Sequence, residues 1–197
     1  MTTGIHNATF ANLQLNAGAF FAGMDYKSYA TVAELKAAIV AKLESGDGLV
    51  GMTMGGGTFV AEPTIRNIEG DGIRSPFVGG SVNDGWNVRL TGTMKEITPA
   101  NFARALISAD VETDGKKTTI TARTTIKEED YISDFCWIGD TAKGYVLIGL
   151  DNALNTAGAT LTFTDKGEGT IPFEFVAHQA NAVDQETAPF VVIFLEE

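Results

Sequence analysis

Two glycine-rich stretches are the first candidates for chemistry. Residues 46–51, with the sequence GDGLVG, match the GxGxxG pattern of dinucleotide-binding proteins. That pattern works where it ends a strand and opens a helix whose N-terminus holds the pyrophosphate, and here it follows a helical pattern. Residues 55–57 are three glycines without the Lys-Ser/Thr pair of a phosphate loop. We interpret 46–51 as a connector and 55–57 as a hinge at the start of a strand.

Carboxylates gather in two places. The acidic residues at 128–130 and Asp134 could hold a hard cation, but they lack the alternating spacing and central glycine of a calcium loop. Asp165 and Glu168 could serve as the carboxylate pair of a glycosidase. Because glycines flank this pair between two strand patterns, a hairpin turn explains it better, and a solvated turn explains the first group.

Cysteine and histidine offer little further chemistry. Cys136 is the single cysteine and lies in an apolar stretch, so we predict a small core residue. With only His6 and His178 to join it, neither a disulfide framework nor a zinc site can form within the chain. No GxSxG motif is present, and His178 has no nucleophile that the sequence places beside it, which favours a surface or interface role. The sequence therefore predicts no enzyme, metal or cofactor.

Composition narrows the class of protein. The chain has 197 residues, a formal net charge of −11, and 44% hydrophobic residues. It can bury a proper core, and no repeat, linker or composition shift divides it, so we expect one domain over residues 1–197. Affinity for nucleic-acid phosphates comes from Lys and Arg, so the acidic balance argues against a nucleic-acid-binding surface.

Apolar runs are short throughout. The longest, residues 190–195, falls far below the ~20 residues that span a bilayer. The first lysine, Lys27, follows the apolar segment 17–24 instead of preceding it as in a secretory signal. We expect synthesis in the cytoplasm and no membrane binding by this chain.

Two helices are predicted. Thr31 with Glu34 forms a capping box that opens a helix over residues 31–44, and Thr98 with Pro99 opens a shorter one. Their expected buried stripes are Val32, Leu35, Ile39 and Leu43 in the first helix, and Phe102 and Leu106 in the second.

Most of the remaining chain has strand patterns. Four segments alternate apolar and polar residues, as in a sheet with one wet face: residues 86–94, 118–126, 159–163 and 170–177. Two others, 145–150 and 190–195, are apolar on both sides and suit central strands or strands at a subunit contact. The fold class is therefore mainly β.

A long glycine-rich segment separates two strand patterns. Residues 70–85 hold five glycines and a few apolar side chains, and a loop of this length in a compact domain usually has a function. Its candidate contact residues are Ile73, Pro76, Phe77 and Val78. We expect it to become ordered when it reaches an adjacent subunit or the next ring, as an inter-ring stacking loop.

Five blocks of sequence follow one another at spacings typical of one family. They are residues 12–21, 56–72, 86–99, 144–154, and 165–178 with the closing Pro189-Phe190. In order and spacing, they resemble the tail tube (major tail) proteins of long-tailed bacteriophages, of the siphophage type. The resemblance covers nearly the whole chain.

The resemblance implies both a fold and an assembly. The expected fold is a β-sandwich or partly closed barrel with one flanking helix, to which the helix at 31–44 adds a second. Six copies would close into a ring through a continuous inner β-barrel, and rings would stack into a tail tube around a tape measure protein. Tail terminator and baseplate or tail tip proteins would be further partners, and double-stranded DNA would pass only in transit. The location would be the virion tail.

The same resemblance assigns roles to particular residues. The subunit-interface strand would include Val191, Val192, Ile193 and Phe194. The candidate lumen-facing residues, which are mostly threonines, are Thr91, Thr93, Thr119, Thr121, Thr160, Thr162, Thr164 and Glu174. A lumen that conducts DNA should not hold it, so Arg89 and Arg123 are expected to pair with acidic residues of a neighbouring subunit or to face away.

Three other functions are compatible with the sequence. The chain could be the inner tube protein of a contractile tail or injection machine, which shares the fold and needs a sheath partner. It could be a capsid-decorating or receptor-binding β-sandwich, which predicts discrete oligomers. A small carbohydrate-active enzyme would require a carboxylate pair in a cleft.

Overall fold

Strand β7 (Gly144–Asn155) is the centre of the molecule, and the computed structural model describes residue 13 and residues 16–181 and 186–196 around it. One edge of β7 pairs with β6 (Ile132–Thr141). Its other edge pairs first with β9 (Phe190–Glu196) and, at its end, with β8 (Ile171–Val176). Both predicted doubly apolar segments are strands, and β7 is central as expected.

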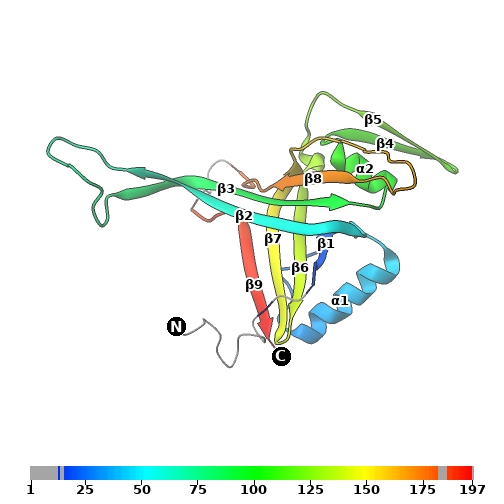
Figure 1. Ribbon diagram of the computed structural model, residues 1–197, viewed down its shortest axis with the longest axis horizontal. Helices are drawn as coiled ribbons and strands as arrows, with labels where there is room; N and C mark the ends of the chain where they lie inside the picture. The colour runs from blue at the N-terminus through cyan, green and yellow to red at the C-terminus, as the bar shows by residue number, and fades with distance from the viewer. Residues whose placement is uncertain (1–12, 14–15, 182–185, 197) are drawn as a thin grey trace.

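Two layers result from this exchange of partners. The seven-stranded antiparallel sheet follows the order β1-β6-β7-β8-β3-β2, with β9 beside β7. Asn152 has a left-handed backbone, with φ of 44°, between the residues of β7 that pair with β9 and those that pair with β8. The layer of β2, β3 and β8 crosses the layer of β1, β6, β7 and β9 at a steep angle (Figure 1). The predicted mainly β class is confirmed, and the large antiparallel sheet does not close into a barrel.

The other elements have the following bounds: β1 (Ala19–Ala22), α1 (Val32–Ser45), β2 (Thr53–Asn67), β3 (Ser81–Met94), α2 (Pro99–Ala105), β4 (Ala109–Asp114), β5 (Lys117–Ala122), and a short 3-10 turn (Glu128–Asp130). No helix in the described part of the chain is long and apolar enough to cross a membrane.

The main core lies between the two layers. Phe20, Phe135 and Phe173 meet there with ring centroids 5.2 to 6.3 Å apart, and the tilted ring of Phe175 lies against Phe135 with centroids 4.2 Å apart. Full burial of one such side chain stabilises the fold by about 1.5–3 kcal/mol. This cluster fixes the two layers to each other.

A second core lies under α1. Leu35 of the helix packs with Phe21, Cys136 and Leu147 on the face of the β1-β6-β7-β9 layer that is turned away from β8. The predicted capping box of Thr31 is present, and Gly46 ends the helix with a φ of 70°. Residues 46–51 therefore cap a helix and cannot open one, as the connector interpretation expects. The predicted stripe is wrong at Leu43, which is exposed.

Helix α2 begins as predicted but buries different residues. Thr98 accepts a hydrogen bond from the Asn101 backbone, and Pro99 occupies the first turn. The buried side chains are Asn101 and Ala105, whereas Phe102 is only half-buried, as is Leu106. The amide of Asn101 has displaced the expected apolar stripe.

Two predicted strands differ in the structure. The pattern at 118–126 is a strand only as far as Ala122, and it pairs with β4 in a separate two-stranded sheet. The chain leaves the strand at Arg123, whose side chain turns toward acidic partners. The pattern at 159–163 makes a single bridge, between Thr162 and Thr170. Within the described residues this bridge is its only ladder contact, so the segment does not form a strand in the single copy.

Candidate assembly surfaces

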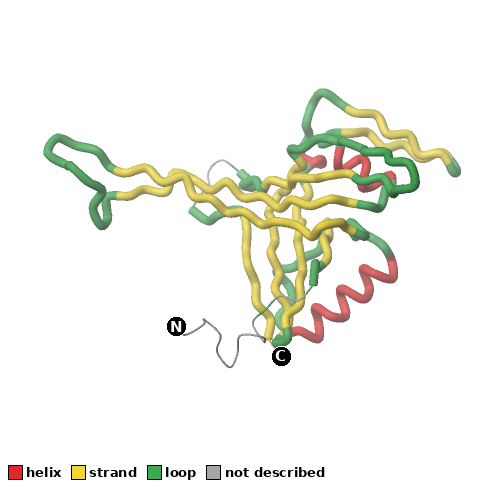
Figure 2. The backbone as a smooth tube through the Cα atoms, in the orientation of Figure 1, coloured by secondary structure: helices red, strands yellow, loops and turns green. Residues whose placement is uncertain are grey.

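The hairpin of β2 and β3 projects from the body as a two-stranded arm, which we define as residues 63–86 (Figure 2). Strand β8 supports β3 only from Arg89 onward, so the arm has no third strand. A two-stranded hairpin alone is at best marginally stable in water. The arm therefore presents long stretches of backbone and side chain without cover from its own copy.

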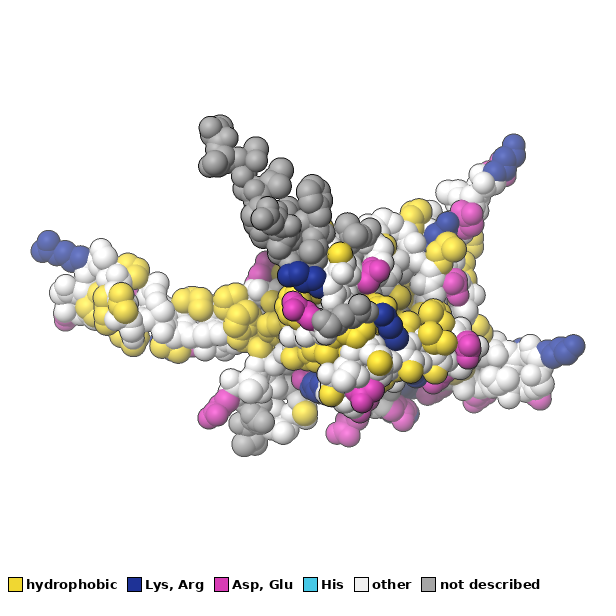
Figure 3. All heavy atoms as spheres, turned by 90° about the horizontal axis from the view of Figure 1, so that it is seen from below, with side chains coloured by type: hydrophobic (Ala, Val, Ile, Leu, Met, Phe, Trp, Pro, Cys, Tyr) yellow, Lys and Arg dark blue, Asp and Glu magenta, His cyan; other side chains and the backbone are white. Residues whose placement is uncertain are grey.

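The arm has an apolar side and a polar side. Pro63 lies opposite Trp86, and both share the side of β2 and β3 that faces the core. On the arm, Arg66 and Asp84 form a bidentate ion pair with N–O distances of 2.8 and 3.1 Å. From below, hydrophobic side chains continue from the arm onto the body (Figure 3). One side of the arm is therefore suited to burial and the other to water.

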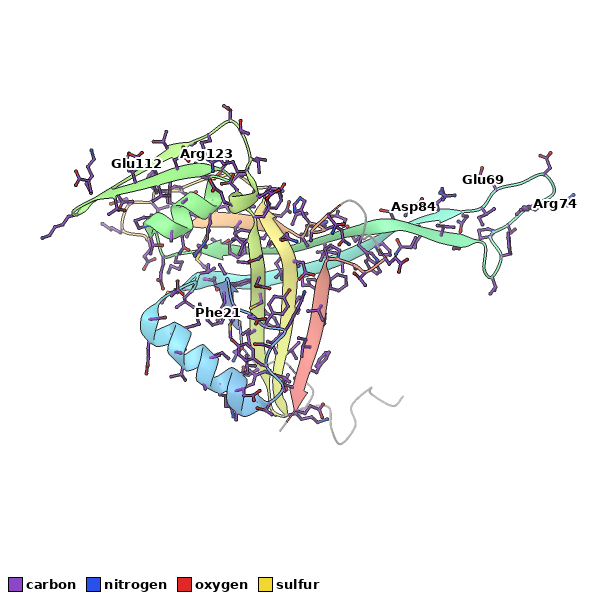
Figure 4. All side chains as sticks on the ribbon, turned by 180° about the vertical axis from the view of Figure 1, so that it is seen from behind. Phe21, Glu69, Arg74, Asp84, Glu112 and Arg123 are labelled. Atoms are coloured by element: carbon purple, nitrogen blue, oxygen red, sulfur yellow. The ribbon has the colours of Figure 1, made fainter. Side chains whose placement is uncertain are left out.

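The tip of the arm is shorter than the predicted loop. Residues 81–85 belong to β3, which leaves residues 68–80 as the connection. The predicted contact residues Ile73, Pro76, Phe77 and Val78 are all exposed there. Figure 4 places Glu69 and Arg74 at the same far end. Val78 is fully exposed, and Ile73 and Phe77 are 43% and 50% exposed, so the described part of the copy covers these apolar side chains poorly.

The predicted interface strand β9 is the edge of its layer. Among the described residues it pairs with β7 alone, and it carries no proline, lysine or bulge that would protect an edge. Val191 and Ile193 face the α1 side and pack on the second core. Val192 and Phe194 face the other way and are 38% and 67% exposed. Only two of the four predicted residues are therefore available to a partner.

Val192 and Phe194 belong to an apolar surface on this face of the layer. We define this apolar wall as the side chains that the strand register places there: Trp137, Val146, Ile148, Val192 and Phe194. A crevice of about 140 Å³ opens beside the wall under the edge of β2. Its lining residues are Phe20, Gly57, Thr58, Phe59, Leu90, Trp137 and Ile148.

The outer side of β2, β3 and β8 forms a polar face. Thr91 lies opposite Glu174 across the β3–β8 pair, and Thr93 follows on the same face. Arg89 lies between Glu62 and Glu174, with N–O distances of 3.3 and 3.9 Å. Its acidic partners belong to its own chain, so the expectation of a pairing with a neighbouring subunit is not needed. Three predicted lumen residues, Thr91, Thr93 and Glu174, share this face.

The remaining predicted lumen residues lie elsewhere. Thr119 and Thr121 are in β5, which belongs to the separate two-stranded sheet, so they do not share the face of Thr91. Thr160, Thr162 and Thr164 lie in the irregular segment between β7 and β8. Of the three, Thr162 alone forms a β-bridge, with Thr170 just before β8.

Arg123 organises the acidic turn. Its guanidinium lies 2.9 Å from Asp110 and 2.5 Å from Asp130, and Figure 4 shows it at the base of the β4–β5 hairpin. Asp130 is almost fully buried by this contact, so it is not the solvated residue that the sequence suggested. The cluster joins the hairpin to the body, and its opposite charges pair with one another, as in a structural ion-pair network.

The other candidates for chemistry have structural surroundings. Cys136 is fully buried, and burial raises the pKa of its thiol. Nδ1 of His178 lies 3.0 Å from the carbonyl oxygen of Val176 and 3.3 Å from that of Asn152, so it must donate. Glu168, in the predicted turn, forms an ion pair with Lys95, which follows β3, with an N–O distance of 3.3 Å. Within the described residues, no three His, Cys, Asp or Glu side chains are grouped so as to hold a metal ion.

Sequence reasoning missed a polar cluster beside the second core. The Tyr26 hydroxyl donates to Asp151 at 2.7 Å, and Lys27 lies 2.7 Å from the same carboxylate. Desolvation and this carboxylate raise the pKa of Tyr26. Residues 125 positions apart are involved, and no local pattern could have indicated them.

No protein-family model matches this chain, and no curated protein matches its sequence.

Proposed function

We propose that this chain is a structural virion protein that assembles as stacked hexameric rings into the tail tube of a long-tailed bacteriophage, the conduit for genome ejection. The resemblance of its sequence blocks to tail tube proteins supports the proposal. So does the mainly β fold with large uncovered surfaces, because a protein that works as a single copy rarely leaves such surfaces exposed.

The observation that carries the proposal is the two-sided layer of β2, β3 and β8. Its inner side is apolar and belongs to the main core, while its outer side is the polar face. Its edge strand β2 pairs with β3 alone among the described strands. A layer that is wet on one side and open at its edge can continue into a second copy, and a closed ring of such layers has a polar lumen.

The polar face suits the passage of DNA. Threonine hydroxyls hold water without fixed charge, and the guanidinium of Arg89 already faces two carboxylates. A net charge of −11 per copy adds general repulsion of the phosphate backbone. DNA could therefore slide past this surface without being gripped.

The arm and β9 supply contacts between copies in this proposal. The arm tip would reach an adjacent subunit or the next ring, and the open edge of β9 would be covered by a neighbour. A tape measure protein would occupy the lumen before the genome, and terminator and tail tip proteins would bind the two ends of the tube. Assembly would take place in the host cytoplasm, and the final location would be the virion tail.

Electron microscopy of the purified chain tests the proposal. We expect rings or tubes at high protein concentration or after addition of a tail tip complex as initiator. A chain that stays monomeric at every concentration, with and without the initiator, would contradict the proposal. Discrete trimers without polymer would favour a capsid-decorating or receptor-binding role, and dependence on a sheath protein would favour a contractile tail.

Variants of the arm tip separate folding from assembly. The double substitution Phe77→Ser with Val78→Ser changes two exposed side chains, so thermal unfolding of the monomer should stay unchanged. Tube growth should be strongly reduced, because the arm would lose its apolar contacts. Normal growth by this variant would show that the tip is not an assembly contact.

A further inference from the structure

The segment at residues 156–164 resembles an unfinished strand. It runs beside β8, where the Thr156 backbone N–H donates to Glu174 O at 2.8 Å and that of Thr162 donates to Thr170 O at 3.2 Å. Between these two contacts it makes no ladder with β8, although its sequence alternates threonines with Leu161 and Phe163. It has the residues of a strand, and none of the described strands pairs with its outer side.

The alternation of this segment matches the two sides of the β2-β3-β8 layer. Thr162 pairs with Thr170, which is in step with Glu174 of the polar face, so Thr162 shares that face. Leu161 points to the other side and packs on the main core. Phe163 is in step with Leu161 but is 81% exposed, so the core of its own copy does not cover it.

Strand β2 is the opposite edge of the same layer. It is 15 residues long and has the same division, with Phe59 on the core side and Glu62 on the polar face. The crevice under this edge, of about 140 Å³, is lined by Phe59, Trp137 and Ile148 among others. An apolar cavity of about 150 Å³ in another protein is large enough to bind benzene.

We propose that the 156–164 segment of one copy completes its strand by pairing with the free edge of β2 in a second copy, and that Phe163 enters the crevice under that edge. The inference rests on the proposed function, since it names the contact that joins neighbours within a ring. The backbone N–H and C=O groups of the two open edges would then hydrogen-bond to each other. The polar sides of the two copies would form one continuous surface.

The two edges are different surfaces, so the contact is head-to-tail. Such contacts close into rings or continue as helices, and they do not stop at a dimer. The pairing would also extend the layer over the apolar wall, which the single copy leaves partly exposed at Val192 and Phe194. This single pairing would therefore bury the apolar wall, the crevice and Phe163 together.

A photo-reactive phenylalanine analogue at position 163 tests the proposal in the full-length chain. In assembled protein, mass spectrometry should find cross-links to peptides that contain Phe59, Trp137 or Ile148. The same analogue at Thr119, in the separate β4–β5 sheet, serves as the control and should not mark these peptides. Rings that form without these cross-links from position 163 would overturn this inference and leave the proposed function standing. Failure to assemble under any condition would overturn both.

Substitutions at position 163 give a second readout. Phe163→Ser should raise the protein concentration at which assembly begins by about tenfold, whereas Phe163→Leu should change it little. Both monomers should unfold at the same temperature as the parent chain, because the side chain is exposed. Hydrogen exchange at Leu161 and Phe163 should slow on assembly of the parent chain. Equal assembly of the two variants, or unchanged exchange in formed rings, would contradict the strand pairing.

Discussion

Trp86 at the base of the arm and Phe190 at the start of β9 pack edge to face, with ring centroids 5.7 Å apart. Phe190 also packs against Phe59 of β2, with ring centroids 5.6 Å apart. These contacts join the C-terminal strand to the hairpin from which the arm projects. The direction of the arm therefore depends on side chains more than 100 positions apart in the sequence.

This aromatic pair gives the first prediction. Trp86→Ala and Phe190→Ala should each lower the free energy of unfolding by about 1–2 kcal/mol, because both rings are partly buried. The double variant should lose less than the sum, with a coupling of about 0.5–1.5 kcal/mol. Urea unfolding of the four proteins measures this coupling. Phe77→Ala at the arm tip is the control and should stay within about 0.5 kcal/mol of the parent.

A sequence predicts this fold where the determining interactions are local. The capping box of Thr31 and Glu34 lies within one turn and correctly places the start of α1. The alternation in β3 and β8 correctly assigns their core sides, since period-two patterns depend only on neighbours. The same logic failed at 159–163, because a strand also needs a continuous ladder, and among the described residues this segment makes only the bridge between Thr162 and Thr170.

Asn101 is a polar residue that the pattern of α2 could not reveal as buried. Its side-chain amide donates to the carbonyl oxygens of Val50, at 2.9 Å, and Glu96, at 3.0 Å. Asn101→Ala should lower the free energy of unfolding by about 1–3 kcal/mol, because the buried carbonyl of Val50 and the partly buried carbonyl of Glu96 lose their donor. Chemical denaturation measures the loss. Asn87→Ala, at an exposed position of β3, should change stability by less than about 0.5 kcal/mol, and equal effects of the two would contradict this role.

The candidate surfaces were harder to predict than the elements that carry them. The exposed tip at Phe77 and Val78 follows from glycine-rich sequence around apolar residues, which a sequence shows directly. Which side of β9 is free depends on where α1 packs, and that contact is tertiary. For the same reason, the sequence could not show that Thr119 and Thr91 belong to different sheets.

Asp134 should make stability depend on pH. Desolvation by burial, followed by the nearby Asp25 carboxylate, raises the pKa of Asp134. The folded state therefore holds this proton more tightly than the unfolded state, so the stabilising effect of protonation is lost as the pH rises through the raised pKa. Asp134→Asn should be more stable than the parent at neutral pH, and the difference should shrink toward pH about 4, where the unfolded carboxyl also protonates.

Thermal or urea unfolding of the Asp134→Asn variant from acidic to neutral pH checks this expectation. Asp165→Asn, in the exposed turn before β8, removes the same negative charge away from this cluster and serves as the control. A stability difference for Asp134→Asn that is constant with pH, or that grows toward acid, would contradict the assigned cause.

Charge on the polar face gives the final prediction, which assumes the proposed conduit. Thr91→Lys with Thr93→Lys adds two positive charges per copy on the side of β3 that would line the lumen. Tubes should still form, because these side chains lie outside the main core, whose β3 members on the opposite side are Val88, Leu90 and Met94. Genome release from virions carrying the variant should slow, since lysines in the lumen would attract phosphates.

The salt dependence and a matched variant make this prediction specific. The delay should lessen at high salt, because the screening length falls there to a few ångströms, from about 8 Å at physiological ionic strength. Thr119→Lys with Thr121→Lys adds the same charge on the separate β4–β5 sheet and should leave the release rate near that of the parent. If the two double variants slow release equally, net charge alone is responsible, and the outer side of β2, β3 and β8 does not line the channel.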